Sequence, residues 1–207
     1  MGIRVVVKGT PSNQGQTFFV SNHLSYLDIP VIGQTLTTYF IAKREVETWP
    51  LFGWLSKLQK TLFIKRSRDG LSEASAKIAD HLNQKHSLTI FPEGTSSNGR
   101  SVLPFKSSLF DVFFNQSHQQ QVLIQPFTIK ISEIDGKPPE KQEDYDLYAW
   151  YGDMELPAHL WSFACWGGAV IELVFHEPFE IGPEDTRKTL CQKSYEKVRA
   201  GLLGNAN

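Results

Sequence analysis

Residues 17–28 decide how this chain folds, and they read Thr17-Phe18-Phe19-Val20-Ser21-Asn22-His23-Leu24-Ser25-Tyr26-Leu27-Asp28. The first four residues are apolar or β-branched and predict a short buried strand. A polar segment with His23 and Asp28 follows, and the chain then becomes apolar again. A strand that ends in such a loop is a common place for an α/β protein to present reactive side chains.

Ser25 and Asp28 are spaced like a helix capping box, with Asp in place of the usual Glu, so we expect a helix to begin at Ser25. His23 then lies just before the helix, and the carboxylate of Asp28 can fold back toward the imidazole. A carboxylate on one ring nitrogen fixes the tautomer and leaves the other nitrogen free to take a proton from an alcohol. The alternative is that Asp28 only caps the helix and that His23 is a solvated loop residue.

The composition predicts one globular domain, because 207 residues with 41% hydrophobic side chains can bury a sizeable core. The formal net charge of -1 identifies no partner, but its distribution is uneven. Between Lys43 and Arg68, seven basic residues stand against two acidic ones, in a chain with 12% aromatic residues. Such a band suits anionic lipid head groups, a phosphate or an acidic carrier protein, unless it is an ordinary solvated face.

The two cysteines, Cys165 and Cys191, have no metal or redox spacing, which favours a reducing, cytosolic setting. No signal peptide is visible, and no apolar run approaches the roughly 18 residues of a membrane span. The sequence opens directly on a strand-like stretch, 3–9, which leaves open that an N-terminal segment precedes it in a longer protein.

Strands alternate with helices along the chain, which predicts an α/β fold. The short link after the first strand allows an antiparallel hairpin, so we expect one mixed, mostly parallel sheet flanked by helices. Pro126 predicts that its strand is an edge strand or carries a bulge. The expected strands are 3–8, 17–20, 38–43, 62–66, 87–91, 122–131 and 169–175, and the expected helices are 25–35, 50–58, 69–85, 106–115, 155–165 and 184–203, with a polar surface excursion at 135–146.

Polar groups follow three of the expected strands, namely His23 with Asp28, Lys65 with Arg66, and the turn Glu93-Gly94-Thr95. Because sites gather at one end of the strands in α/β sheets, we expect these groups to converge. They would supply a base, its orienting carboxylate, a cation and backbone N–H donors, which are the parts for transferring an acyl group onto an alcohol. No Gly-x-Ser-x-Gly elbow and no phosphate-binding glycine motif is present.

The chain resembles the glycerolipid acyltransferase family, which includes bacterial 1-acylglycerol-3-phosphate acyltransferases. Four blocks carry the resemblance, in the family's order, over residues 17–131. They are the His-x4-Asp motif at His23 and Asp28, a strand ending in arginine at 63–66, Phe-Pro-Glu-Gly-Thr at 91–95, and a hydrophobic strand with proline at 122–127.

The resemblance implies that His23 is the general base and that Asp28 orients it. Arg66 would contact the phosphate or acidic head group of the acceptor, and Glu93 and Gly94 would shape the acceptor site, although Glu93 could instead form a buried pair with Arg66. The other residues assigned to substrate binding are Thr95, Lys65 and Lys106.

The resemblance also implies a lysolipid acceptor, an acyl-coenzyme A or acyl-carrier protein donor as co-substrate, contact with a membrane surface, no nucleic acid partner, and neither a metal nor a bound cofactor. The expected location is the cytoplasmic face of the inner membrane, reached peripherally or through an N-terminal segment that this sequence lacks. Residues 1–207 would form a single acyltransferase domain, with the motifs in 17–131 and a C-terminal completion in 132–207.

Two positions depart from the family pattern. Ser96 stands where phosphate-using members commonly have Arg, and Lys65 where Asp or Asn is frequent. The missing Arg removes a bidentate phosphate clamp, for which Lys65, Arg68, Arg100 or Lys106 are imperfect substitutes. The runs 93–99, 102–106, 151–153 and 159–161 look like the branch of lyso-ornithine-lipid acyltransferases, so the acceptor stays open between 1-acylglycerol-3-phosphate and lyso-ornithine lipid.

Three alternatives remain beside acyl transfer. Water could replace the lipid alcohol, which would make the protein a thioesterase-like hydrolase. The basic, aromatic band could belong to a lipid- or carrier-binding protein without turnover. A metal site could be built from His23, Asp28 and Glu93.

Overall fold

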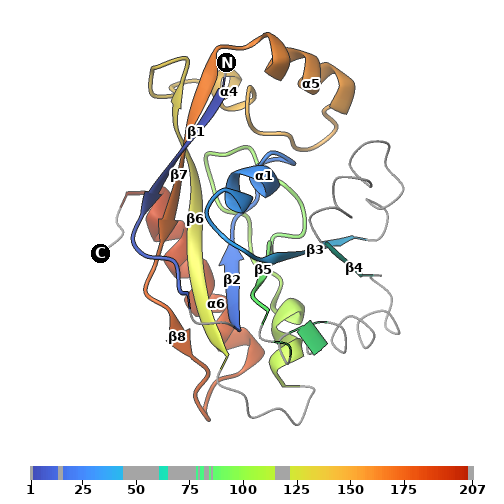
Figure 1. Cartoon of the computed structure of the whole chain (residues 1–207), viewed down its shortest axis with the longest axis vertical. Coiled ribbons are helices and arrows are strands. Elements are labelled where there is room, and N and C mark those ends of the chain that lie inside the picture. The colour runs from blue at the N-terminus through green and yellow to red at the C-terminus, as the bar shows by residue number, and fades with distance from the viewer. Residues whose placement is uncertain are drawn as a thin grey trace.

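The computed structural model describes residues 2–13, 16–43, 61–64, 78, 80–81, 84, 86–114 and 122–204. Within these residues, eight strands form one sheet in the order β1-β7-β6-β2-β5-β3-β4, and β8 pairs with β6 off this path (Figure 1). The strands are β1 Gly2–Lys8, β2 Thr17–Ser21, β3 Tyr39–Lys43, β4 Leu62–Ile64, β5 Leu88–Ile90, β6 Leu123–Ile134, β7 Gly168–Phe175 and β8 Phe179–Glu180. The helices are α1 Asp28–Gly33, the 3-10 helix η2 Ser107–Phe113, α4 Gln142–Tyr145, α5 Leu156–Cys165 and α6 Arg187–Leu202.

The sheet is mixed and mostly parallel, as predicted, but the predicted hairpin between the first two strands is wrong. β1 pairs with β7 in parallel, whereas β2 lies between β6 and β5 and is parallel to both. The antiparallel character comes instead from β7 and β8, which both run against β6. All five residues of β2 are buried, and a strand with two apolar faces belongs in the middle of a sheet rather than in an edge hairpin.

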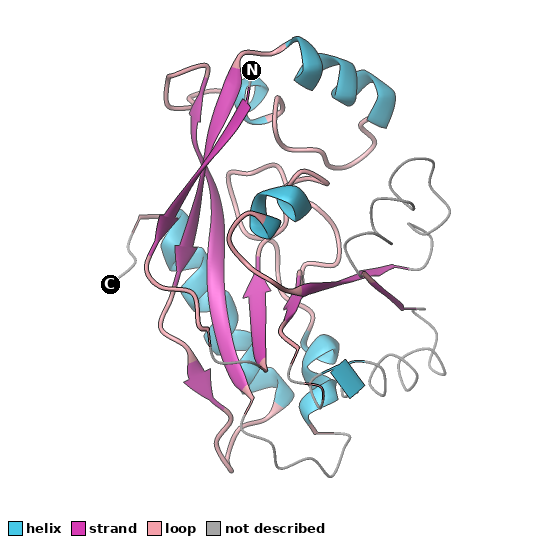
Figure 2. Cartoon of the chain, viewed as in Figure 1, coloured by secondary structure: helices cyan, strands magenta, loops and turns pink. Residues whose placement is uncertain are grey.

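Alternate side chains of β2 point to opposite faces of the sheet and pack into two separate parts of the core. Phe18 packs with Phe110 of η2 and Leu190 of α6, whereas Phe19 packs with Val31 of α1. Each such side chain contributes roughly 1.5–3 kcal/mol when it leaves water. Figure 2 shows the corresponding layers, with α1 in front of the sheet and α6 behind it.

The prediction that Pro126 marks an edge strand is wrong, because β6 has partners on both sides. Pro126 pairs with Val20 of β2 on one side. On the other side its carbonyl accepts from His176 N at 3.0 Å, just after β7 ends at Phe175 and before β8 begins. The absent N–H of the proline therefore falls where the partner of β6 changes from β7 to β8, and the carbonyl of His176, which such an N–H would meet, accepts instead from Gln125 Nε2 at 3.0 Å. The bulge of this strand lies further on, between Ile131 and Glu133.

Several predicted helices differ from the observed ones. α1 begins at Asp28, three residues later than expected, because Asp28 Oδ2 accepts from Leu24 N and Ser25 N and folds the chain before it into a turn. The predicted helix at 106–115 is a 3-10 helix, whereas the helices predicted at 155–165 and 184–203 correspond to α5 and α6. α4 and β8 were not predicted, the expected helix at 50–58 lies outside the described residues, and that at 69–85 lies almost wholly outside them.

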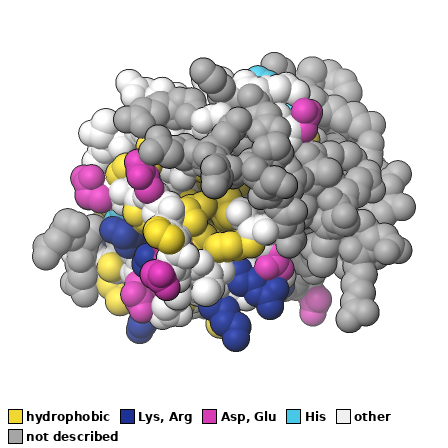
Figure 3. All heavy atoms as spheres, turned by 90° about the horizontal axis from the view of Figure 1, so that it is seen from below, with side chains coloured by type: hydrophobic (Ala, Val, Ile, Leu, Met, Phe, Trp, Pro, Cys, Tyr) yellow, Lys and Arg dark blue, Asp and Glu magenta, His cyan; other side chains and the backbone are white. Residues whose placement is uncertain are grey.

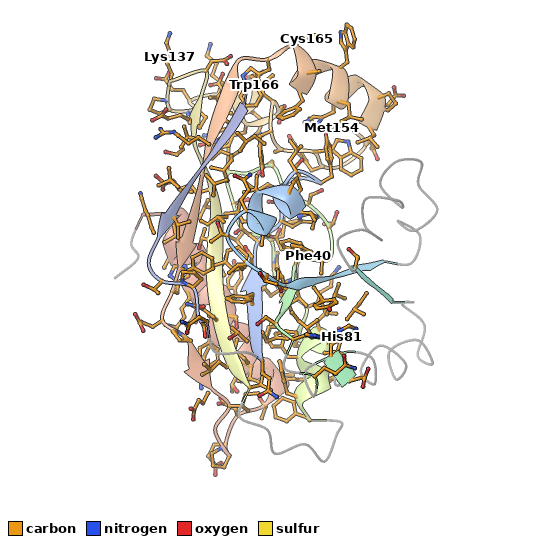
Figure 4. All side chains as sticks on the ribbon, viewed as in Figure 1. Phe40, His81, Lys137, Met154, Cys165 and Trp166 are labelled. Atoms are coloured by element: carbon orange, nitrogen blue, oxygen red, sulfur yellow. The ribbon has the colours of Figure 1, made fainter. Side chains whose placement is uncertain are left out.

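The remaining views place individual side chains and show one face of the surface. Phe40 lies near the centre, below α1, whereas Cys165 and Trp166 lie at the end of α5 at the top (Figure 4). Seen from below, apolar side chains show at the centre of the described surface, with charged side chains around them (Figure 3). Among the described helices, none has the length and apolar character that crossing a bilayer requires.

Candidate active site

The His23 loop leaves the sheet at a polar anchor. Asn22 Nδ2 donates to Ile129 O at 2.9 Å, and Asn22 Oδ1 accepts from Ile129 N at 2.8 Å. The buried amide thus continues the pairing of β2 with β6 by one step, while the main chain is free to turn away. Because β2 and β5 are parallel, the residues that follow them emerge at the same edge of the sheet.

His23 and Asp28 form a close pair at that edge. His23 Nδ1 lies 2.7 Å from Asp28 Oδ2, and the ring of His23 stacks on Phe91 with 4.2 Å between centroids. Asp28 is fully buried, whereas the side chain of His23 keeps 23% of its surface exposed. A carboxylate only accepts hydrogen bonds, so Nδ1 carries the proton and Nε2 holds the lone pair. The predicted folding back of the carboxylate onto the imidazole is confirmed.

The carboxylate of Asp28 is held on both oxygens. Oδ2 also accepts from Leu24 N at 2.7 Å and from Ser25 N at 3.1 Å, and Oδ1 accepts from the hydroxyl of Tyr148 at 2.9 Å. These hydrogen bonds offset the cost of burying the carboxyl group away from water.

Glu93 holds the backbone of His23 rather than presenting its carboxyl to a ligand. Oε1 accepts from His23 N at 3.1 Å and Oε2 accepts from Leu103 N at 3.2 Å. The side chain is 2% exposed. Burial raises the pKa of Glu93 to about 8, against the opposing effect of the two N–H donors. The alternative pairing with Arg66 involves a residue outside the described part of the chain.

The turn after β5 is tied to the same loop. Gly94 has φ +70°, which favours glycine, and its N–H donates to Phe91 O at 3.0 Å. Ser97 N donates to His23 O at 2.8 Å, so the loops after β2 and β5 meet as the convergence argument predicted. Thr95 is exposed beside them.

Only some of the basic residues predicted to bind the acceptor lie in the described part of the chain. Lys65 and Arg66, and also Arg68, lie outside the described residues. Lys106 is exposed at the start of η2, and its backbone N–H donates to Pro92 O at 2.9 Å. The guanidinium of Arg100 lies 5.7 Å from the centroid of the Tyr145 ring. Within the described chain, the structure therefore assembles the base, the two carboxyls and the turn.

Sequence reasoning missed the aromatic residues that cover this loop. Besides Tyr148, they are Tyr26, whose hydroxyl lies 3.0 Å from His159 Nδ1, and Trp150, whose backbone N–H donates to Leu24 O at 2.9 Å. Burial raises the pKa of Tyr26 to about 12 and lowers the pKa of His159. The only sequence signal is a cluster of aromatic residues at 145–151, which has no periodicity and no motif.

The metal alternative finds no support in the described residues, where no group of three or more His, Cys, Asp or Glu side chains could hold a metal ion. Glu93 directs both oxygens at backbone N–H groups. What the arrangement offers is an imidazole whose Nδ1 meets a buried carboxylate and whose Nε2 has no hydrogen-bond partner among the described residues, which is the geometry of a general base.

Comparisons with known proteins agree with this chemistry. The Acyltransferase family matches residues 3–130. Lyso-ornithine lipid O-acyltransferase from Rhodobacter capsulatus is 35% identical, over 98% of this chain and 71% of the relative. The 1-acyl-sn-glycerol-3-phosphate acyltransferase of Neisseria gonorrhoeae is 25% identical, over 98% of this chain and 75% of the relative.

The fold of this chain is also similar to that of a solved acyltransferase structure. The crystal structure of the 1-acyl-sn-glycerophosphate (LPA) acyltransferase PlsC from Thermotoga maritima superposes with a TM-score of 0.65 at 26% identity, and covers 97% of this chain and 71% of that chain. The predicted α/β fold is thereby confirmed. The chain belongs to the acyltransferase family, as its four sequence blocks predicted, and it is an O-acyltransferase.

Proposed function

We propose that the protein transfers a fatty acyl group from a thioester donor to the hydroxyl of a lysolipid, with His23 as the general base. The observation that carries the proposal is the 2.7 Å bond between His23 Nδ1 and the buried Asp28, which leaves Nε2 as the proton acceptor. A positioned base of this kind contributes roughly a hundred- to ten-thousand-fold in rate.

In the proposed reaction, Nε2 of His23 removes the proton of the lysolipid hydroxyl as its oxygen attacks the thioester carbonyl carbon. An O–C bond forms and the carbonyl oxygen becomes an oxyanion, for which polarising donors are required. When the tetrahedral intermediate collapses, the C–S bond breaks and the thiolate takes the proton from His23. The products are the doubly acylated lipid and the free thiol of the donor.

For the acceptor, we propose lyso-ornithine lipid ahead of 1-acylglycerol-3-phosphate. Relatives of 30–35% identity carry the name lyso-ornithine lipid O-acyltransferase, and the 1-acyl-sn-glycerol-3-phosphate acyltransferases of Neisseria are 25% identical. Ser96, at the position where phosphate-using members commonly have Arg, donates its hydroxyl hydrogen bond to Trp150 O. It is therefore engaged within the protein, and a phosphate clamp at this position would need another residue.

The donor and the location complete the proposal. The thioester would be acyl-carrier protein or acyl-coenzyme A, and neither a metal nor a bound cofactor enters the reaction above. The working site would be the cytoplasmic face of the inner membrane. α5 supports contact with a membrane surface, because its ten residues include no charged side chain and its Trp161 is 73% exposed.

The test is an assay of purified protein with a labelled acyl donor, in which lyso-ornithine lipid and 1-acylglycerol-3-phosphate are offered in parallel and products are separated by thin-layer chromatography. We expect acylated product from lyso-ornithine lipid, and its loss in His23→Ala. Product from 1-acylglycerol-3-phosphate alone would overturn the acceptor proposal and keep the reaction. Free fatty acid that forms at the same rate without lysolipid would indicate a hydrolase.

A further inference from the structure

Tyr148 reaches the candidate active site from outside the four sequence blocks. It lies 120 positions after Asp28 and beyond residues 3–130, to which the family match extends. Its side chain is fully buried, and its hydroxyl donates to Asp28 Oδ1 at 2.9 Å. The three other donors to this carboxylate all bind Oδ2, so Tyr148 is the one described donor that fixes Oδ1.

The main chain around Tyr148 is fastened to both loops of the site. Trp150 N donates to Leu24 O at 2.9 Å, within the His23 loop, and Trp150 O accepts from the hydroxyl of Ser96, in the turn after β5. Tyr148 N donates to Tyr145 O at 3.0 Å. Residues 148–150 therefore bind the His23 loop through the side chain of Tyr148 and the backbone N–H of Trp150.

The phenol is also a permanent donor. Burial raises the pKa of Tyr148 well above its usual value, and the charge of Asp28 acts in the same direction. Tyr148 therefore keeps its proton wherever Asp28 is ionised. A donor on Oδ1 spreads the negative charge of the carboxylate and sets the plane in which Oδ2 meets the imidazole.

We infer that Tyr148 is a positioning residue for the His23–Asp28 pair, and that through Asp28 it sets both the orientation and the basicity of the general base. The inference rests on the proposed role of His23 and adds to the site a segment that the sequence blocks do not contain. Of the described titratable groups, Asp28 and Glu93 bind the His23 loop directly, and Tyr26, which belongs to this loop, acts electrostatically on Tyr148. All of these stay unchanged when only the hydroxyl of Tyr148 is removed.

The test is Tyr148→Phe, which keeps the buried ring and removes the hydroxyl. Without its donor on Oδ1, the carboxylate holds the proton on the imidazole more strongly, so His23 stays protonated to higher pH. We expect a loss in kcat of about tenfold with little change in the acceptor KM, and a shift of the acid limb of the kcat/KM profile to higher pH. The matched control is Tyr151→Phe, which removes a hydroxyl that donates to Asp146 Oδ1 at 3.1 Å and should move neither quantity.

Two further measurements separate positioning from simple packing. In an Asp28→Asn background, Tyr148→Phe should cost little additional rate, because the carboxylate through which it acts is gone. In the substrate-free protein, Tyr148→Phe should also shift the proton resonance of His23 Nδ1, and Tyr151→Phe should not. Multiplicative rate losses, together with an unchanged pH profile and an unchanged resonance, would overturn the inference. The resonance needs no turnover, so an inactive wild type would count against the proposed function alone.

Discussion

Two histidines of this protein follow strands that run in opposite directions, so they lie at opposite ends of the strands of the same sheet. Their chemical surroundings are also opposite. His23 comes two residues after β2, and His176 comes directly after β7, which runs antiparallel to the strands around β2. His23 meets a carboxylate and keeps part of its ring exposed. His176 is 8% exposed, and its Nε2 lies 2.9 Å from Thr128 Oγ1.

The partner decides what each ring can do. Thr128 gives its own proton to Val198 O at 2.8 Å, so its hydroxyl can only accept from His176. No negative charge faces this ring among the groups that shift its pKa, and burial, followed by Lys197, lowers the pKa of His176 to about 4. A hydroxyl partner in a dry site therefore fixes a neutral, structural imidazole. A buried carboxylate partner beside solvent favours the imidazolium that a general base must form.

The largest test of this comparison makes the same substitution at both sites. His23→Ala should lower acyl transfer by about a hundred- to ten-thousand-fold, because the proton acceptor is lost, with thermal unfolding close to wild type. His176→Ala should retain turnover per folded molecule and lose about 2 kcal/mol of stability in urea unfolding, because Thr128 is left without its donor. Full activity in His23→Ala, or loss of turnover in a folded His176→Ala, would reverse the assignment.

The second test changes the carboxylate rather than the ring. Asp28→Asn should lower kcat by about a hundred- to ten-thousand-fold, because a neutral amide cannot stabilise the imidazolium. Asp111→Asn is the matched control, since it removes a carboxylate that pairs with Arg187 at 2.7 Å on the surface. We expect the control to keep wild-type kcat. An Asp28→Asn enzyme that matched the control in steady-state kinetics would show that Asp28 only caps its helix.

The part of the site that could be predicted is the part that is local in sequence. His23 and Asp28 are five residues apart, and the strand before them and the turn between them are short-range features. Glu93 could be placed near them because parallel strands end at one edge of a sheet. Its actual partners, the backbone N–H groups of His23 and Leu103, depend on how two loops dock, which no spacing encodes.

The errors are of the same long-range kind. The chain length between β1 and β2 permitted a hairpin, but strand order depends on which strand has two apolar faces, and β2 took the centre. Tyr148 reaches Asp28 across 120 positions from a segment without periodicity. The roles given to Lys65, Arg66, Thr95 and Lys106, and the domain limits 1–207, stay predictions.

A third, smaller effect concerns Glu93, the carboxyl that meets His23 through its backbone. Its folded pKa of about 8 lies above the usual 4.5, so the folded state holds the proton more tightly and loses stability as pH rises from 4.5 toward 8. His176 is present both in the wild type and in Glu93→Gln, so its contribution cancels when the two proteins are compared, and the range from pH 6.5 to 8 tests Glu93. Between these two pH values, we expect the wild type to lose about 1.5 kcal/mol relative to Glu93→Gln in urea unfolding. A constant difference between the two proteins would show that Glu93 is ionised throughout this range.

A last effect tests the comparison at the structural histidine. The folded pKa of His176, about 4, lies below its usual value of 6.5, so the unfolded chain binds the proton first and stability is lost as pH falls from 6.5 toward 4. His176→Gln keeps a donor for Thr128 and cannot titrate, so its deficit against the wild type at pH 7 should shrink by about 2 kcal/mol at pH 5. Because Glu93 is present in both proteins, its opposite contribution cancels in the difference. A deficit that stayed constant in urea unfolding at the two pH values would mean that His176 is charged in the fold, and the two histidines would then differ in position alone.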